Sequence, residues 1–238
     1  MNLLAFDTST DILSIAVQHG DLVREHTGPG GAQASAVLIP TINRLLAEAG
    51  LSFAALDAIV FGRGPGSFTG LRTACAVAQG LAFGARGGAG VPVLPVDTLL
   101  AVAEEARQRH GCTQVVAVLD ARMDEVYSAR CEWLPAEHRW QADADFGLGA
   151  PETVEVPAGW SVAGNARTPY GERLAPQAPH VPALPTAAAL LRLAPALLAA
   201  GGAMAASDAL PRYIRDKVAK TTAEREALRA AQAASNPS

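Results

Sequence analysis

The first residues that could do chemistry follow the opening apolar segment. Asp7 ends the run LLAFD and is followed by Thr8, Ser9 and Thr10. In two-lobed phosphotransfer folds this place holds a metal-linked carboxylate beside hydroxyls that bind phosphate. The same residue types also close strand ends by hydrogen bonding to the turn backbone. The sequence leaves both interpretations of Asp7 and Thr8 open.

A second aspartate, Asp120, occupies the matching place in the second half of the chain. The segment QVVAVLDARM (114–123) is again an apolar run that ends on Asp, and EVYSARCEW (125–133) alternates like a strand. We interpret this as a weak internal repeat of two related lobes with a cleft between them. Asp7 and Asp120 could then face one cleft and hold magnesium, and their spacing in sequence leaves open whether they meet.

The segment GRGPGSFTGLR (62–72) is rich in glycine. It lacks the GK[ST] ending of a Walker A motif and is not G-x-G-x-x-G, so it is weak as a nucleotide motif. It is typical of a strand-to-helix turn, with Ser67 as the helix N-cap. The next residues are unusually small at many positions, namely Gly70, Ala74, Cys75, Ala76, Ala78, Gly80 and Ala82. A helical glycine costs about 1 kcal/mol against alanine, so this helix indicates close packing, either on its own sheet or at a subunit interface.

Other patterns for catalysis are scarce. The five histidines are scattered without an HExxH pattern, so no histidine metal site is predicted. There is no GxSxG elbow and no Cys/His pairing with supporting spacing. The three cysteines, Cys75, Cys112 and Cys131, form no CxxC pair and fit small buried side chains in a reducing compartment.

The elements that position these residues follow a recognisable order. Two apolar strands and a third after a Gly-Asp turn predict an antiparallel meander. It is followed by alternating helices and strands, which we place at 34–49, 58–62, 68–85, 91–96 and 98–110. This β-β-β-α-β-α-β-α order is that of a ribonuclease-H-like lobe.

We therefore predict three regions. Residues 1–110 form an N-terminal lobe that carries a partner interface, 111–220 form a C-terminal lobe, and 221–238 form a tail that frays. The stretch 184–206 nearly reaches membrane-spanning length but contains Arg192 and Pro195, so a core helix is the better interpretation. Residues 134–183 are rich in Pro, Gly and Ala and show few periodic runs.

The composition and net charge indicate the class of protein and argue against some functions. Of the 238 residues half are apolar and 18% are charged, as in ordinary globular proteins, and the net charge is −4. An acidic balance argues against a chain that holds nucleic acid unaided, because phosphate binding normally needs a basic face. The first residues lack the basic start and the apolar length of a signal peptide, so we expect a cytoplasmic protein.

Several segments together resemble the bacterial TsaB (YeaZ) family. They are LLAFDTST, GRGPGSFTGLR, AQGLAFG, LDARMDEVY and PRYIR, and they span residues 3 to about 215. The resemblance implies an α/β fold of two ribonuclease-H-like lobes of the actin/Hsp70/sugar-kinase type. It also implies a role in making N6-threonylcarbamoyladenosine next to the anticodon of tRNA.

In that family the chemistry belongs to a paralogue, TsaD, which has a histidine-bound metal. The resemblance implies that this chain is a non-catalytic, dimerising partner of TsaD, that an ATPase, TsaE, joins the assembly, and that tRNA is reached only through the complex. The chain could also pair with a second copy of itself. No cofactor or metal is expected for the chain, ATP or ADP could act at the level of the complex, and no membrane is involved.

The resemblance also places the partner surface on the helices at 34–49 and 68–85. The residues expected there are Val37, Leu38, Thr41, Leu45, Phe68, Leu71, Ala74, Cys75, Ala78 and Ala82. A bulky charge at Ala78 is then expected to abolish partner binding. The chain departs from relatives at Ala34-Ser35, where a His often precedes Ser or Thr, and at Ala74, where Gly is common. Asp7, Thr8, Ser9 and Asp120 are expected to form a vestigial cleft.

Two other functions stay open. An ATP-dependent phosphotransferase or ATPase that uses the interlobe cleft is favoured by Asp7, Thr8 and Asp120 and weakened by the missing phosphate signatures. A peptidase is a third class, but the sequence offers no nucleophile, base or metal site for it.

Overall fold

The computed structural model describes residues 1–215, and its first sheet has five strands. They are β1 (Asn2–Asp7), β2 (Ile12–His19), β3 (Leu22–Pro29), β4 (Ala58–Gly64) and β5 (Val93–Asp97), in the order β3-β2-β1-β4-β5. The first three strands pair antiparallel, whereas β4 and β5 run parallel to β1. The predicted meander with parallel additions is therefore confirmed.

The second sheet repeats this arrangement. Its strands are β6 (Gln114–Arg122), β7 (Glu125–Leu134), β8 (Arg139–Ala142), β10 (Ser161–Gly164) and β11 (His180–Pro182), in the order β11-β10-β6-β7-β8. A further short strand, β9 (Gly147–Gly149), pairs with β7. The strands β6 to β8 form an antiparallel meander and β10 and β11 lie parallel to β6, so the internal repeat is confirmed.

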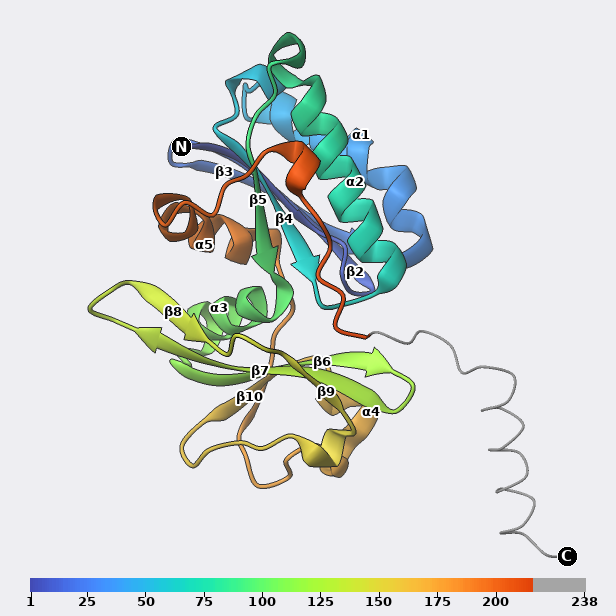
Figure 1. Cartoon of the computed structure of the whole chain (residues 1–238), viewed down its shortest axis with the longest axis vertical. Helices are drawn as coiled ribbons and strands as arrows, with labels where there is room; N and C mark the ends of the chain where they lie inside the picture. Colours follow the sequence, from blue (N-terminus) through green and yellow to red (C-terminus); the bar gives the residue numbers. More distant parts are fainter. Residues whose placement is uncertain (216–238) are drawn as a thin grey trace, which may run out of the picture.

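The helices form layers around the two sheets (Figure 1). Helices α1 (Ala34–Glu48) and α2 (Phe68–Gly84) cover the outer face of the first sheet, while α3 (Thr98–His110) and α5 (Ala187–Ala199) lie between the sheets. The short α4 (Arg167–Tyr170) lies on the far side of the second sheet. Single 3-10 turns occupy Gly31–Gln33, Phe53–Ala55, Ala85–Gly88, Pro151–Thr153, Gly171–Arg173 and Ala206–Asp208.

The last described segment returns to the first lobe. Helix α5 lies within 111–220, the range assigned to the second lobe, yet it packs on β1, β2 and β4 of the first sheet. Beyond it, Met204 pairs with Val93, and the Arg212 amide donates to the Arg63 carbonyl at 2.7 Å. The range 111–220 is therefore wrong as a single lobe, because the apolar face of α5 is buried by the other sheet. The predicted tail, 221–238, lies outside the described residues.

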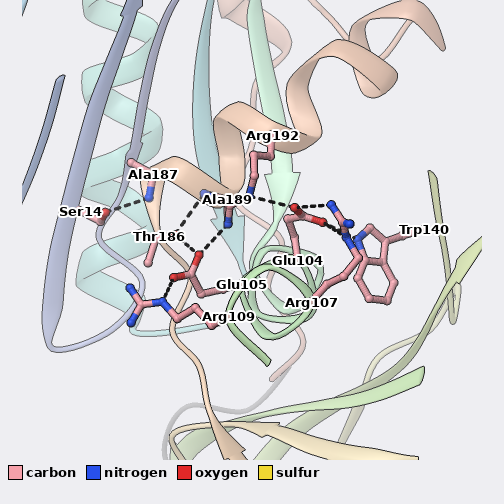
Figure 2. A network of polar contacts seen from close by, with 10 residues as sticks. All are labelled: Ser14, Glu104, Glu105, Arg107, Arg109, Trp140, Thr186, Ala187, Ala189 and Arg192. Carbon is pink, nitrogen blue, oxygen red and sulfur yellow. Dashed lines mark hydrogen bonds and ion pairs between the residues drawn. The ribbon is translucent and has the colours of Figure 1, made fainter. Parts of the chain in front are cut away.

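A buried ionic network joins α3 to α5 (Figure 2). Glu104 is 1% exposed, and its carboxylate accepts from Nε and Nη2 of Arg107, from Arg192 Nε at 2.9 Å and from Trp140 Nε1 at 3.0 Å. Trp140 comes from β8, so one carboxylate collects donors from both lobes. Buried charges are tolerated only when they are paired in this way.

The neighbouring Glu105 extends the network. Its Oε2 accepts from Arg192 Nη2 at 2.7 Å and from the Thr186 hydroxyl at 2.8 Å, and Arg109 pairs with the other oxygen. Burial raises the pKa of Glu105, but the hydrogen bonds from Arg192 and Thr186 outweigh this and the pKa is lowered overall. The stretch 184–206 thus contains a core helix, as predicted, with Arg192 paired inside the fold. Among residues 1–215 no helix combines the length and the apolar character that a membrane crossing needs.

Candidate functional site: the interlobe cavity and the outer helix face

A cavity of about 510 Å³ opens between the lobes at the ends of β1 and β6. The first lobe contributes the turn after β1 and the start of α2, the second contributes the β6–β7 turn, and residues 212–215 contribute a wall. The lining residues are Ser9, Thr10, Asp11, Pro65, Gly66, Ser67, Phe68, Leu71, Leu119, Asp120, Ala121, Arg122, Met123, Tyr127, Asn165, Arg212, Tyr213, Ile214 and Arg215.

Asp7 does not reach this cavity. Its side chain is fully buried, and Oδ1 accepts from the amide of Ser9 at 2.8 Å and from the Ser9 hydroxyl at 2.6 Å. Its Oδ2 lies against Gly62 and has no hydrogen-bond partner among the described residues. Burial raises the pKa of Asp7 to about 6, against the smaller effect of the Ser9 hydrogen bonds. The expectation that Asp7 faces the cleft is therefore wrong.

Thr8 and Ser9 hold the glycine-rich loop in place. Thr8 Oγ1 donates to the Gly70 carbonyl at 2.7 Å, and the Ser67 amide donates to the Ser9 carbonyl at 2.7 Å. A Cβ on Gly70 would lie 1.9 Å from the Thr8 carbonyl oxygen, so this close approach requires glycine. Ser67 caps α2 as predicted, accepting from the Gly70 amide. The structural interpretation of Thr8 is the one that these contacts support.

Asp120 does line the cavity, but its oxygens are occupied. Oδ1 accepts from the Tyr170 hydroxyl at 2.8 Å and from the Arg122 amide at 2.8 Å, and Oδ2 pairs with the Arg122 guanidinium at 3.1 Å. Burial, and then the bond to Asp120, raise the pKa of Tyr170 to about 12. The structure therefore does not bring Asp7 and Asp120 together as two free carboxylates. Within residues 1–215 no cluster of three or more His, Cys, Asp or Glu side chains could hold a metal ion.

Each arginine of the lining is held by a carboxylate. Arg122 pairs with Asp120 and with Asp11 across the cleft. Arg212 pairs with Asp97 at 3.2 Å, and Arg215 pairs with Glu125 at 2.7 Å. The positive charge at the cavity is therefore largely neutralised within the chain.

The segment 209–215 spans both lobes beside the cavity. Arg212 donates to the Ala144 carbonyl of the second lobe, and Arg215 donates to the Ala121 carbonyl. Tyr213 stacks on Phe68 of α2, with 5.5 Å between ring centroids, and its hydroxyl accepts from Arg72. Sequence reasoning used PRYIR only as a family signature, and its alternation of Arg with apolar residues gave no signal for this role.

Most of the predicted partner surface is inside the protein. Leu38, Leu45, Ala74, Cys75, Ala78 and Ala82 are buried in the core between the first sheet and its two outer helices, and Leu71 is buried where α2 lines the interlobe cavity. Their assignment to a contact surface is wrong, because the small side chains of α2 let it pack closely on its own sheet. Only Val37 and Phe68 of the predicted set are exposed, and Thr41 is half-buried.

The outer face of the same two helices is free within the described chain. Val37 and Ile39 of α1 are exposed, and so is Phe83 of α2, at 72%. Ala76 and Gly80 lie on the exposed side of α2 at helical spacing from Phe83. A Cβ on Gly80 would meet no atom within 4 Å, so no close contact within residues 1–215 explains this glycine.

Two repeated sheets of this topology, with helices between and outside them and a cavity at the matching strand ends, define the class of the protein. It is an α/β protein with two ribonuclease-H-like lobes of the actin/Hsp70/sugar-kinase type. A family model described as TsaD, tRNA N6-adenosine threonylcarbamoyltransferase, matches residues 25–146. The chain belongs to the TsaB (YeaZ) family of tRNA threonylcarbamoyladenosine biosynthesis proteins.

Individual relatives support this membership. The tRNA threonylcarbamoyladenosine biosynthesis protein TsaB of Escherichia coli (strain K12) is 32% identical over 230 residues, 92% of this chain and 96% of that protein. The solved structure named YeaZ from Pseudomonas aeruginosa is 39% identical, with a TM-score of 0.81 over 89% of this chain and 99% of that chain. A second solved structure, described as an uncharacterized protein with similarity to peptidase YEAZ from Pseudomonas aeruginosa, has the same identity and TM-score.

Proposed function

We propose that this chain is a non-catalytic subunit in the formation of N6-threonylcarbamoyladenosine on tRNA, where it binds and supports a TsaD-like transferase. A TsaE-like ATPase would join the same assembly, and tRNA would be bound through the complex. The net charge of −4 supports an indirect contact with tRNA, because a chain that binds phosphate alone normally carries a basic face.

The observation that carries this proposal is the outer face of α1 and α2. Phe83, Val37 and Ile39 are large apolar side chains exposed to solvent, and a Cβ on Gly80 would meet no atom of residues 1–215 within 4 Å. A glycine in a helix interior costs about 1 kcal/mol, which a partner that approaches the helix backbone closely would offset. Gly80 and Phe83 are three residues apart and share one exposed side of α2, and an exposed apolar patch is a common mark of a protein interface. We place the partner surface here, on the outer side of the helices whose inner residues were predicted for this role.

The occupied groups of the cleft support a chain without catalysis of its own. Asp120 accepts from Tyr170 and pairs with Arg122, and Asp7 is fully buried beneath the glycine-rich loop 62–72. Neither carboxylate is therefore available as a metal ligand or a general base. We propose that the chain needs no cofactor and that ATP or ADP acts at the level of the assembled complex.

Mixing the purified chain with the TsaD of its own organism tests the proposal. Size-exclusion chromatography with light scattering should show a heterodimer, and threonylcarbamoylation of tRNA by the reconstituted system should be lost when this chain is omitted. Absence of a complex with ATP, with ADP and without nucleotide would refute the scaffold role. Homodimers of the isolated chain would be seen in the same experiment.

The variant Gly80→Arg tests whether the partner surface includes the exposed side of α2. Because the position is open and Arg favours a helix more than Gly does, the variant should fold with thermal stability no lower than that of the unmodified chain but lose TsaD binding. The matched control is Arg24→Ala on β3, where the side chain is exposed on a different element. Ala78 is unsuited to this test, because it is fully buried and a charge there would disrupt the core. Full binding by folded Gly80→Arg would exclude this part of α2 from the interface.

A further inference from the structure

The interlobe cavity is lined by a buried tyrosine whose hydroxyl makes no hydrogen bond to the part of the chain that the structure describes. Tyr127 of β7 is 7% exposed, lies opposite Leu119 in the β6–β7 register, and lines the cavity with it. The Tyr127 hydroxyl makes no hydrogen bond within residues 1–215. Among these residues, Asp7 Oδ2 is the only side-chain oxygen or nitrogen that is fully enclosed and has no partner, so the Tyr127 hydroxyl is not fully enclosed. The Tyr127 hydroxyl is therefore reached from the cavity. Buried tyrosine hydroxyls usually find a hydrogen-bond partner.

A second donor points to the same space. Asn165 lines the cavity, and its Oδ1 accepts from the Asp120 amide at 2.9 Å, which fixes the side-chain amide. With Oδ1 engaged in this way, its Nδ2 group makes no hydrogen bond within the described chain. The N-terminus of the 17-residue helix α2 also faces the cavity through Ser67 and Phe68, and a helix N-terminus favours an acceptor. The Tyr127 hydroxyl and the Asn165 Nδ2 group are thus two donors at the cavity without a partner among the described residues.

The charge around the cavity argues against a phosphorylated ligand. The three arginines of the lining, Arg122, Arg212 and Arg215, are each paired with a carboxylate. The carboxylates that line the cavity or pair with these arginines are Asp11, Asp97, Asp120 and Glu125, and Asp97 also pairs with Arg63, so four carboxylates balance four guanidinium groups. A triphosphate would have to break these pairs, which costs binding energy.

The remaining walls are apolar and partly aromatic. Leu71, Leu119, Ile214 and Pro65 line the interior, and the Phe68 ring stands at its edge with Tyr213 stacked on it. A cavity of about 510 Å³ falls within the range of small-molecule sites, roughly 300–1,000 Å³, which are mostly apolar with a few placed polar groups.

We propose that this cavity is a binding site for a small, uncharged, planar heterocycle that carries hydrogen-bond acceptors, with Tyr127 and Asn165 as the donors that orient it. The inference is independent of the scaffold function, because it concerns the interlobe cavity and not the outer face of α1 and α2.

Caffeine is a suitable probe, since it is a neutral bicyclic ring system with acceptors and no donors. Titration of the ¹⁵N-labelled chain by NMR should give saturable shifts at the amides of 119–123 and 212–215, with a dissociation constant in the millimolar range expected of a small ligand. Tyr127→Phe should weaken binding about fivefold, because it removes one hydrogen bond of about 1 kcal/mol. The matched control, Tyr213→Phe, should change affinity less than twofold, because that hydroxyl already accepts from Arg72.

Two further measurements make the outcome decisive. With tyrosine labelled at the ring carbon that bears oxygen, the Tyr127 signal of the unmodified chain should move with caffeine, while Tyr170, whose hydroxyl is held by Asp120 and Glu125, should not move. ATP should give no saturable shift at the same amides. Absence of saturable binding, equal affinity in Tyr127→Phe, a silent Tyr127 signal, or tighter binding of ATP than of caffeine would each overturn the proposal.

Discussion

Two buried carboxylate regions of this protein are stabilised in opposite ways. At the end of β1, Asp7 is fully buried, and within residues 1–215 its Oδ2 has no hydrogen-bond partner and its carboxylate forms no ion pair. Between α3 and α5, Glu104 and Glu105 are as deeply buried but accept from three arginines, a tryptophan and a threonine (Figure 2). Burial alone therefore does not predict whether an ionised carboxylate stabilises or destabilises the folded chain, because this depends on the hydrogen-bond donors and cations around it.

The difference appears in the pKa directions. The pKa of Asp7 is raised to about 6, so the folded chain binds its proton more strongly than the unfolded chain. The pKa of Glu105 is lowered, so its contribution is present above the unfolded value and is lost as the pH falls. Protonation at low pH should thus remove the stabilising contribution of Glu105 at the α3–α5 junction, while it removes the destabilising charge of Asp7.

The largest effect is expected when the network loses its shared cation. Arg192→Met leaves Glu104 and Glu105 buried with fewer donors and should lower the free energy of unfolding by about 3 kcal/mol. The control is Arg44→Met on α1, whose pair with Glu48 is exposed and should contribute less than about 1 kcal/mol. Urea unfolding of both variants measures the difference. Equal losses would show that the network behaves as an ordinary surface pair.

Asp7→Asn should have the opposite sign and depend on pH. The pKa of Asp7 is raised from 3.8 to about 6, so keeping this carboxylate ionised in the folded chain lowers the free energy of unfolding by on the order of 3 kcal/mol. This loss grows between about pH 4 and 6 and is constant at higher pH. The variant should therefore be more stable than the unmodified chain at pH 8, and this gain should vanish at pH 4. Asp120→Asn, which loses its pair with Arg122, should show no such gain. A pH-independent effect of Asp7→Asn would contradict the raised pKa.

Helix α2 has one glycine on its buried face, Gly70, and one on its exposed face, Gly80. Gly70→Ala places a Cβ against the Thr8 carbonyl and should cost about 2 kcal/mol by overpacking beside Asp7. Gly80→Ala meets open space and should gain up to about 1 kcal/mol from helix propensity. Thermal melts of the two variants test the same chemical change on two faces of one helix. Destabilisation by Gly80→Ala would indicate a backbone role that its surroundings do not show.

The topology was predictable because its signals are local. The apolar runs LLAFD and QVVAVLD each end on Asp, and the helices between strands keep regular spacing, so both the sheet order and the repeat followed from the pattern. The place of α5 was not predictable, because its apolar face could be buried by either sheet and the choice depends on long-range packing.

The site was harder to predict for the same reason. The small residues of α2 indicated close packing, but the sequence does not say which side of the helix faces the sheet, and Ala78 was assigned outward although it is buried. Asp7 and Asp120 stand at repeat-related positions, yet Gly62 lets Asp7 lie beneath the loop while Arg122 and Tyr170 occupy Asp120. Tyr127 and Arg212 belong to the family segments LDARMDEVY and PRYIR, but those segments did not indicate that the two residues meet at one cavity, because this depends on contacts distant in sequence.

The smallest effect is expected at the open side of the lobe junction. Arg122 crosses the cleft to Asp11, and both side chains are mostly exposed, unlike the arginines around Glu104. Asp11→Asn removes the exposed acceptor and leaves Arg122 paired with Asp120, so it should lower the free energy of unfolding by less than about 1 kcal/mol, and part of that loss should disappear at high salt, because salt screens exposed pairs. Stability measured at low and high ionic strength tests this. A loss as large as that of Arg192→Met, unchanged by salt, would mean that the cleft side holds the lobes together as firmly as the buried network does.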